Sequence, residues 1–375
     1  MEIGFDAKRA FHNRSGLGNY SRNAITALSR FYPQNHYFLC TPSTSDLFLW
    51  NNLPCLSAIS PRGLWKIFHP LWRSSAIITN LKNNNVKLYH GLSNELPRGL
   101  KKSGIKSVVT IHDLIFLRHP EFYPAADRYI YHRKSLHACS EADHIIAVSE
   151  ETKTDIMNFY KIPDEKISVI CQSVSSRFYQ GATEQQQLNV KEKFTLPKEF
   201  ILCVGTIEKR KNLLAVLKAM DRMDSKYRLP LIIIGKATSY KKQADQFIQQ
   251  HRLADHVQYL SNVLNEDLPF IYQAATLLAY PSENEGFGLP LAEALASGLP
   301  VVCNDLKVFR EAAGPFSLYV DANNPEGFAA AILSVMNDAE LQKSMAAEGR
   351  LYSTKFRDEV QASQLQILYQ KLLAE

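Results

Sequence analysis

The sequence predicts an α/β protein of two domains, each built around a parallel β-sheet. Three observations lead to this prediction. The chain has 375 residues, about the length of two ordinary domains. Short β-rich runs alternate with helical stretches from end to end, and runs such as 231–234 are apolar at every position, as strands covered on both faces are. A polar stretch without periodicity, 179–187, divides this series of strands into two.

The expected strands form two groups. The first comprises 2–6, 36–41, 86–90, 106–112, 143–148 and 167–171, and the second comprises 200–205, 230–235, 257–260, 276–280 and 300–303. Leu365, Leu368 and Leu372 recur at helical spacing, so residues 357–375 should form a helix that docks on an apolar surface. We therefore expect an N-terminal Rossmann-like domain over 1–178, joined by this helix, and a C-terminal one over 188–356. Ligands bind at the carboxyl ends of such strands, which we expect to face a central cleft.

Composition excludes several classes of protein. Hydrophobic residues make up 46% of the chain and charged residues 21%, which indicates a globular protein rather than a disordered one. The first residues include no basic leader, and nowhere do 18 apolar residues follow one another without a break. We therefore expect neither a signal peptide nor a membrane-spanning helix.

The six scattered cysteines predict buried thiols in a reducing cytoplasm. His132 and His137 share no helix face, and we predict no metal site.

The strongest motif follows the expected strand 276–280. Glu285 precedes a glycine-bearing loop, Gly286-Phe287-Gly288-Leu289, which enters a helix that carries Glu293. The backbone N–H groups of this loop would form an anion site at a helix N-terminus. A carboxylate on the loop can accept hydrogen bonds from sugar hydroxyls, and one on the helix can reach a ribose. The alternative is a plain connection with two solvated glutamates.

A second motif follows the strand 200–205. Gly205 ends this strand, and the adjacent cations Lys209, Arg210 and Lys211 precede a helix. Such cations make poor core residues but good diphosphate ligands, Arg210 as a planar fork and Lys211 as a point charge. A solvated basic turn is the alternative, and it is less favoured because the Glu285 loop should lie at the same sheet edge.

The expected N-terminal domain carries two weaker signals. Gly16 and Gly18 open a helix as in half of a dinucleotide fingerprint, but Ser21 replaces the third glycine, so a phosphate-contacting loop fits better than nicotinamide binding. An ordinary helix-entry turn is the alternative. His112 lies at the carboxyl end of its strand, where ligands bind, although lone histidines are more often structural. A Gly-x-Ser-x-Gly elbow and a P-loop are both absent.

With these motifs the chain resembles a family 4 retaining glycosyltransferase of the GT-B type, also described as glycosyl transferases group 1, over nearly its whole length. The carriers of the resemblance are 15–20, 111–113, 205–212 and 285–298. The resemblance implies that Glu285 holds the donor sugar and Glu293 the nucleotide ribose. It implies that Arg210 and Lys211 neutralise the departing diphosphate, which the Gly16–Gly18 loop approaches, with His112 beside the sugar.

One residue departs from the family pattern. Many members carry Arg directly after the glycine that corresponds to Gly205, where this chain has Thr206. The phosphate role then rests more heavily on Arg210 and Lys211.

The resemblance further implies hexosyl transfer that retains the anomeric configuration and uses no metal and no cofactor besides the nucleotide-sugar donor. The segment 205–212 looks most like that of mannosyltransferases, which favours GDP-mannose, with a UDP-sugar as the alternative donor. The acceptor would be a glycan, free or linked to polyprenyl diphosphate, in surface polysaccharide synthesis. A GT-B sugar-nucleotide epimerase and a non-catalytic carbohydrate-binding protein are the alternatives from other classes.

The basic charge of the first half concerns the acceptor. Residues 1–180 contain 22 Lys and Arg against 14 Asp and Glu, whereas 181–375 contain 21 against 23. No nucleic-acid-binding module accompanies this excess, and we expect no nucleic acid partner. Within 62–73, Trp65, Phe68 and Trp72 fall on one helix face among basic residues if Pro70 permits a helix there. This pattern predicts peripheral contact of a cytoplasmic enzyme with the inner face of the membrane. A helix packed into the core is the alternative.

Overall fold

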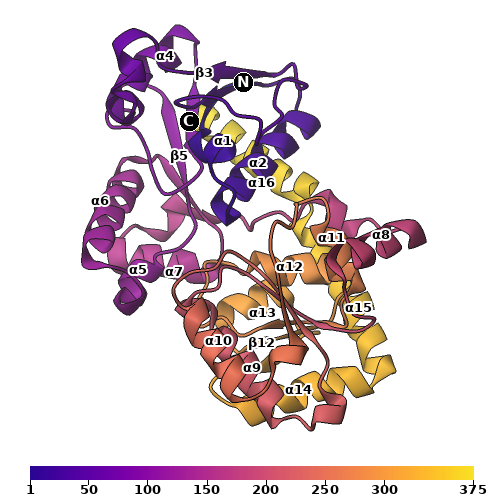
Figure 1. The fold of residues 1–375 in the computed structure, drawn as a ribbon. Helices are drawn as coiled ribbons and strands as arrows, with labels where there is room; N and C mark the ends of the chain where they lie inside the picture. The colour runs from indigo at the N-terminus through magenta and orange to yellow at the C-terminus, as the bar shows by residue number, and fades with distance from the viewer. The chain divides into compact units, whose positions relative to one another are not determined.

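A computed structural model describes all 375 residues and confirms the α/β class, with two parallel sheets. The chain forms two compact units (Figure 1). Unit 1 comprises Met1–Ser173 and Asp358–Glu375, and unit 2 comprises Val174–Arg357.

Unit 1 is built on a seven-stranded parallel sheet in the order β3-β2-β1-β4-β5-β6-β7. Its strands are β1 (Glu2–Asp6), β2 (His36–Cys40), β3 (Leu56–Ile59), β4 (Leu88–Gly91), β5 (Lys106–Ile111), β6 (His144–Ala147) and β7 (Ile167–Val169). Its helices are α1 (Lys8–His12), α2 (Gly16–Phe31), α3 (His69–Leu71), α4 (Ile77–Asn83), α5 (Ile115–Arg118), α6 (Ala125–Glu141), α7 (Glu150–Tyr160) and α16 (Asp358–Ala374). The strand order reverses between β1 and β4, so the position where such sheets bind ligands lies at the carboxyl ends of these two strands.

Apolar side chains fill the space on both faces of this sheet. On one face, Phe5 of β1 belongs to a buried cluster with Leu28 of α2 and Leu365 of α16. On the other face, Val109 of β5 belongs to a second cluster with Ala138 of α6. The C-terminal helix α16 is thus part of the core of unit 1, because its apolar stripe is covered by α2 and the sheet.

Unit 2 is built on a six-stranded parallel sheet in the order β10-β9-β8-β11-β12-β13. Its strands are β8 (Ile201–Val204), β9 (Leu231–Ile234), β10 (Val257–Leu260), β11 (Leu277–Tyr280), β12 (Val301–Asn304) and β13 (Leu318–Val320). Its helices are α8 (Glu184–Phe194), α9 (Leu213–Arg222), α10 (Lys241–Gln250), α11 (Leu268–Ala274), α12 (Leu289–Ala296), α13 (Lys307–Ala313), α14 (Pro325–Asn337) and α15 (Ala339–Ser353). The switch of strand order lies between β8 and β11, the two strands that precede the Arg210–Lys211 and Glu285 segments.

The structure corrects the expected element boundaries in two ways. The strands β3 and β13 were not predicted; both lie at sheet edges, and neither carries a long apolar run. The polar stretch 179–187, expected between the domains, lies inside unit 2. There α8 begins, and a capping box between Thr183 and Gln186 explains why so polar a segment starts a helix.

The tryptophan segment does not form the single helix that its spacing predicts. It consists of the 3₁₀ turn η1 (Gly63–Lys66), the short α3 and the π-helical turn η2 (Trp72–Ala76), with Pro70 at the start of α3. Trp72 is buried in the core, whereas Trp65 and Phe68 are exposed. The alternative of packing into the core is therefore confirmed for Trp72, whereas the rings of Trp65 and Phe68 form the exposed surface.

Two further findings concern the whole chain. All six cysteines are free and all but Cys171 are buried, as predicted. None of the helices combines the length and the apolar character needed to cross a bilayer.

Candidate active site

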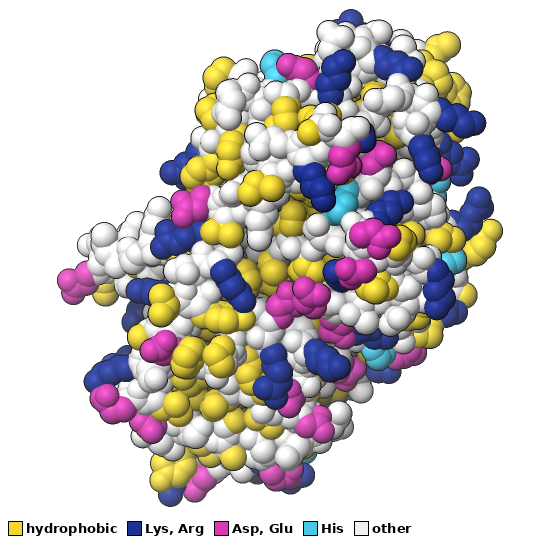
Figure 2. Space-filling model, turned by 180° about the vertical axis from the view of Figure 1, so that it is seen from behind, with side chains coloured by type: hydrophobic (Ala, Val, Ile, Leu, Met, Phe, Trp, Pro, Cys, Tyr) yellow, Lys and Arg dark blue, Asp and Glu magenta, His cyan; other side chains and the backbone are white.

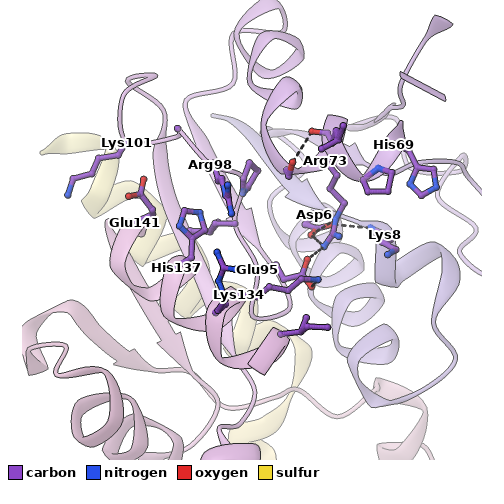
Figure 3. A pocket seen from close by; sticks show the side chains of 18 of the residues that line it. Asp6, Lys8, His69, Arg73, Glu95, Arg98, Lys101, Lys134, His137 and Glu141 are labelled. Atoms are coloured by element: carbon purple, nitrogen blue, oxygen red, sulfur yellow. Dashed lines mark hydrogen bonds and ion pairs between the residues drawn. The ribbon is translucent and has the colours of Figure 1, made fainter. Parts of the chain in front are cut away.

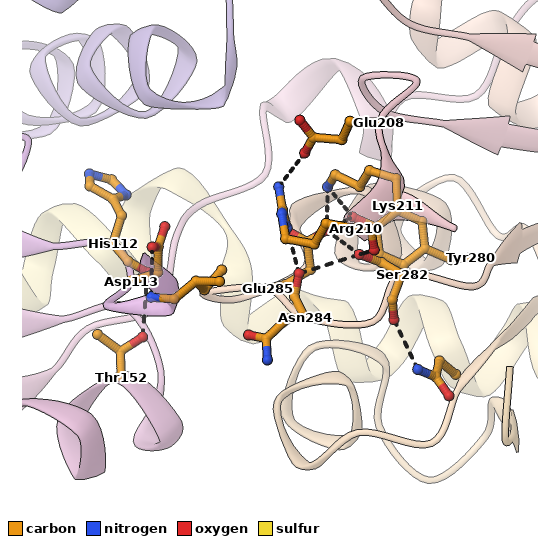
Figure 4. A network of polar contacts seen from close by, with 12 residues as sticks. His112, Asp113, Thr152, Glu208, Arg210, Lys211, Tyr280, Ser282, Asn284 and Glu285 are labelled. Carbon is orange, nitrogen blue, oxygen red and sulfur yellow. Dashed lines mark hydrogen bonds and ion pairs between the residues drawn. The ribbon is translucent and has the colours of Figure 1, made fainter. Parts of the chain in front are cut away.

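In unit 2, the carboxylate of Glu285 is the centre of a partly buried polar cluster (Figure 4). It forms ion pairs with Lys211 and, at 3.0 Å, with Arg210. The hydroxyl of Tyr280 donates to Glu285 Oε1 at 2.9 Å, and that of Ser282 donates to the same oxygen at 2.8 Å. Residues from two sheet-edge loops more than 70 positions apart in the chain thus meet at one carboxylate.

The electrostatics of this cluster favour an ionised carboxylate. Burial alone would raise the pKa of Glu285, but the charges of Lys211 and Arg210 outweigh it and lower the pKa to about 2. Arg210 also pairs with Glu208 at 2.7 Å, so two cations and two carboxylates meet at the carboxyl ends of β8 and β11 and their charges balance. Such a site suits a ligand that pairs a sugar with a negatively charged group.

The local backbone explains how the cations reach this position. Gly205 follows β8 and donates its N–H to Ile234 at 2.9 Å, at the end of the neighbouring strand β9. The chain then forms the 3₁₀ turn η6 (Lys209–Lys211) and enters α9 through Asn212, which has a left-handed φ of 50°. The ammonium of Lys211 also donates to Tyr280 Oη at 3.0 Å. The turn directs Arg210 and Lys211 toward the Glu285 loop, while Lys209 is exposed.

The loop after Glu285 begins α12. Gly288 is the N-cap with a φ of 100°, and a side chain there would also meet Leu291 and Phe309, so the position requires glycine. Pro290 has no N–H, and the N–H of Leu291 donates to the carbonyl of Gly288 at 2.9 Å, so an anion at this helix start would be favoured by the helix dipole and by the N–H of Leu289. The side chain of Phe287 is buried against Phe356, so Phe287 can contact a ligand only through its backbone.

Glu293 lies inside α12 and is separate from the ion cluster. The hydroxyl of Tyr272 donates to its Oε2 at 3.1 Å. Burial raises the pKa of Glu293 to about 8, so at neutral pH the carboxyl group carries a proton and can both donate and accept a hydrogen bond. A ribose, whose hydroxyls do the same, is a suitable partner.

In unit 1, the glycine pair opens α2. A side chain at Gly18 would lie 1.9 Å from the carbonyl oxygen of Asn13, so close backbone packing explains this glycine without a ligand. The space around Gly16 is open, with nothing within 4 Å of a Cβ placed there. Of the two, Gly16 is the one whose surroundings leave room for a phosphate.

His112 follows β5 and is buried, with both ring nitrogens engaged. Nε2 lies 2.9 Å from the carbonyl oxygen of Leu92, which can only accept, so Nε2 carries the proton. Nδ1 then accepts from the side-chain amide of Gln172 at 3.2 Å. Burial lowers the pKa of His112 to about 4, and the ring stands edge-on to Tyr20 of α2 at 4.6 Å. His112 is therefore a neutral, fixed imidazole rather than a proton carrier at neutral pH.

The structure thus places the expected site residues in two groups, one in each unit. Gly16, Gly18 and His112 lie in unit 1 around α2 and β5. In unit 2, Arg210 and Lys211 both contact Glu285. The remaining predicted residues also lie in unit 2: Gly205, Gly286, Phe287, Gly288, Leu289 and Glu293.

Sequence reasoning missed Tyr280, Ser282 and Gln172. Tyr280 ends an apolar strand and reads as a core residue, whereas Gln172 lies just after β7, a position that could have suggested it.

Comparison with known proteins matches both halves of the chain. The glycosyl transferases group 1 family matches residues 184–352, and glycosyltransferase family 4 matches residues 14–177. O-antigen chain mannosyltransferase B of Escherichia coli is 31% identical over 296 residues, which cover 78% of this chain and 75% of that protein. O-antigen chain mannosyltransferase RfbU of Salmonella typhimurium is 31% identical over 335 residues, which cover 86% of this chain and 87% of that protein.

Solved structures confirm the GT-B fold. The Anabaena protein HepE in complex with UDP has a TM-score of 0.77 at 16% identity, covering 99% of this chain and 100% of its own. WaaG, a glycosyltransferase involved in lipopolysaccharide biosynthesis, has a TM-score of 0.72 at 15% identity, covering 97% of this chain and 98% of its own. The chain belongs to family 4 of the glycosyltransferases and is a transferase with two Rossmann-like units.

Proposed function

We propose that this enzyme transfers mannose from GDP-mannose to a growing glycan during the synthesis of a surface polysaccharide. The two relatives named as O-antigen chain mannosyltransferases, each 31% identical, support this choice of sugar and pathway class. The partly buried cluster of Arg210, Lys211 and Glu285 carries the donor assignment, because it combines a carboxylate for the sugar with two cationic side chains for the diphosphate.

Cleavage of the bond between the sugar and the diphosphate develops negative charge on the diphosphate and positive charge on the anomeric carbon. We assign the first charge to Arg210, Lys211 and the N-terminus of α12, which are fixed before the reaction and need no reorganisation. Glu285 binds the sugar, and Glu293 binds the ribose. A diphosphate oxygen accepts the proton of the incoming hydroxyl, and transfer retains the anomeric configuration without a metal.

His112 has a positioning role in this proposal. Its imidazole is neutral and held by two hydrogen bonds, so we assign it to shaping the sugar site rather than to proton transfer. Of Gly16 and Gly18, which open α2, we assign Gly16 to the diphosphate, because the space beside it is open.

A UDP-sugar is the second candidate donor, because the structural neighbour HepE carries UDP. The acceptor is a glycan, which we propose is linked to polyprenyl diphosphate and met at the inner face of the membrane. The exposed rings of Trp65 and Phe68 support this membrane contact.

The test is a product assay with GDP-mannose or a UDP-sugar, each with and without a lipid-linked oligosaccharide acceptor and each with and without EDTA. We expect acceptor-dependent release of GDP that EDTA does not reduce, and an NMR spectrum in which the new linkage has the anomeric configuration of the donor. Conversion of the donor without acceptor would instead indicate an epimerase. An inverted linkage, or transfer only from a UDP-sugar, would contradict the mechanism or the donor, respectively.

A further inference from the structure

Charged side chains are dispersed over the face seen in Figure 2, but one groove of unit 1 gathers cations. This groove has a volume of about 970 Å³ and runs between α6 and residues 95–102 (Figure 3). One end reaches Asp6, the last residue of β1, and Glu95, which follows β4. The groove therefore begins at the strand-order switch of the sheet, the position at which open α/β sheets bind ligands.

The carboxylates at this end of the groove are already neutralised. The guanidinium of Arg73 lies 2.7 Å from Asp6 Oδ2 and 2.6 Å from Glu95 Oε2. Lys134 adds a further ion pair with Glu95 at 3.1 Å. Arg73 extends from the π-helical turn η2, an element that is frequent at functional sites.

Five other cations line the groove without an ion pair. They are Lys8, Arg98, Lys101, Lys102 and Arg133. Glu141 is the remaining carboxylate of the lining. Burial is the main cause that lowers the pKa of Lys8; the nearby Arg73 lowers it further, whereas Glu95 and Asp6 act in the opposite direction. A bound anion would compensate the cations that Glu141 alone does not balance.

An apolar ridge continues one wall of the groove. We define it as Leu64, Trp65, Ile67, Phe68 and Leu71, all of which are exposed, Leu64 and Ile67 to 76% and 73%. Leu71 also lines the groove. On the opposite wall, Tyr129 and Ile130 of α6 are exposed as well. The groove is thus cationic along its length and apolar at its rim.

We propose that this groove binds the phosphate groups of a lipid-linked acceptor, with the apolar ridge inserted into the surrounding lipid. The inference rests on the proposed transferase function and names the residues of its acceptor side. Arginine forks such as Arg98 and Arg133 match phosphate oxygens in pairs, and an acceptor without phosphate would leave five cations with only Glu141 to balance them. A water-soluble acceptor would leave the ridge without a partner.

The test measures binding of the full chain to phosphatidylcholine vesicles that contain undecaprenyl diphosphate. Vesicles of equal charge in which phosphatidylglycerol replaces that lipid provide the comparison, and inorganic diphosphate serves as a soluble competitor. Binding is followed by co-sedimentation and by the fluorescence of Trp65, which is exposed and should shift to shorter wavelength in lipid. We expect at least tenfold tighter binding to the undecaprenyl diphosphate vesicles.

Two variants and a matched control assign this binding. Arg98→Ala/Arg133→Ala should lower the affinity on the order of tenfold or more, since each fork donates charge-assisted bonds. Ile67→Ser/Phe68→Ser should abolish the fluorescence shift. Lys82→Ala/Lys87→Ala removes the same charge from exposed positions outside the groove and should bind as the wild type does.

Equal binding to both kinds of vesicle, or equal effects of the groove and control variants, would overturn the proposal in favour of general attraction to anionic membranes. Titration with GDP separates this outcome from failure of the donor assignment. The groove and ridge variants should bind GDP as the wild type does, because GDP is assigned to unit 2. Loss of lipid binding with normal GDP binding supports the groove, whereas a wild type that binds the lipid but not GDP would refute only the proposed donor.

Discussion

Replacing Glu285 by glutamine should separate nucleotide binding from sugar transfer. Glu285 and Glu208 balance the charges of Arg210 and Lys211. Without the charge of Glu285, one positive charge is left uncompensated for the diphosphate. GDP should therefore bind at least as tightly as in the wild type. Transfer should fall on the order of 10²-fold, because the sugar loses a preorganised carboxylate.

The same change has a consequence for stability that follows from the pKa. The pKa of Glu285 is lowered from 4.5 to about 2, which corresponds to about 3 kcal/mol at roughly 1.36 kcal/mol per unit. Because the folded-state value is the lower one, the ionised carboxylate stabilises the fold above about pH 4.5. This contribution disappears as the pH falls toward 2. The glutamine variant should accordingly lose on the order of 3 kcal/mol at pH 7.

The assay combines calorimetric titration with GDP, single-turnover transfer and thermal unfolding at pH 7. Glu266→Gln, an exposed change of the same type in unit 2, is the matched control and should resemble the wild type in all three. A folded Glu285→Gln enzyme that transfers within about threefold of the wild-type rate would refute the sugar-binding role. If GDP binding weakened in parallel with transfer, this would refute the separate roles assigned to the two cations, which bind the diphosphate, and to Glu285, which binds the sugar.

Three further predictions concern the other site residues. The pKa of Glu293 is raised to about 8, so between about pH 4.5 and 8 the folded chain holds a proton that the unfolded chain releases. The Tm should therefore fall as the pH rises through this window, and Glu293→Gln should remove that part of the slope. Identical slopes for the variant and the wild type would contradict the assignment. Gly18→Ala places a methyl group against a backbone oxygen and should lower the Tm, while Gly16→Ala, in open space, should not; equal effects would contradict the packing. Gln172→Glu places an anion at His112 Nδ1 and should raise the pKa of His112 above about 4 in an NMR titration; an unchanged value would argue against the contact.

Much of the fold could be predicted because the central strands are continuously apolar. The strand Leu231–Ile234 is buried at every position, so its own apolar sequence is enough to identify it as a strand. The edge strands β3 and β13 escaped prediction because half-exposed edges carry short, mixed runs. A single helix over 62–73 depended on whether Pro70 permits it, and the structure shows that it does not, because Pro70 begins the separate short helix α3.

The candidate site was predictable only in part, for a similar reason. Arg210, Lys211 and Glu285 stand out because charged side chains directly follow apolar strands. Tyr280 could not be found in this way, because its role depends on its contact with Lys211, 69 positions away in the chain. The position of Gln172 after β7 could have suggested a site residue, but its contact with His112 depends on the tertiary fold. The tautomer of His112, fixed by the carbonyl of Leu92, likewise depends on tertiary contacts.

The central claim is that Arg210 and Lys211 hold the diphosphate of a guanosine donor, and calorimetric titration with GDP tests it most directly. The wild type should bind GDP, and Lys211→Ala should bind it on the order of 10- to 100-fold more weakly. Lys209→Ala, which removes the same charge from the neighbouring exposed residue, should bind GDP as the wild type does. Equal binding by the two variants, or a wild type that binds UDP but not GDP, would contradict the account.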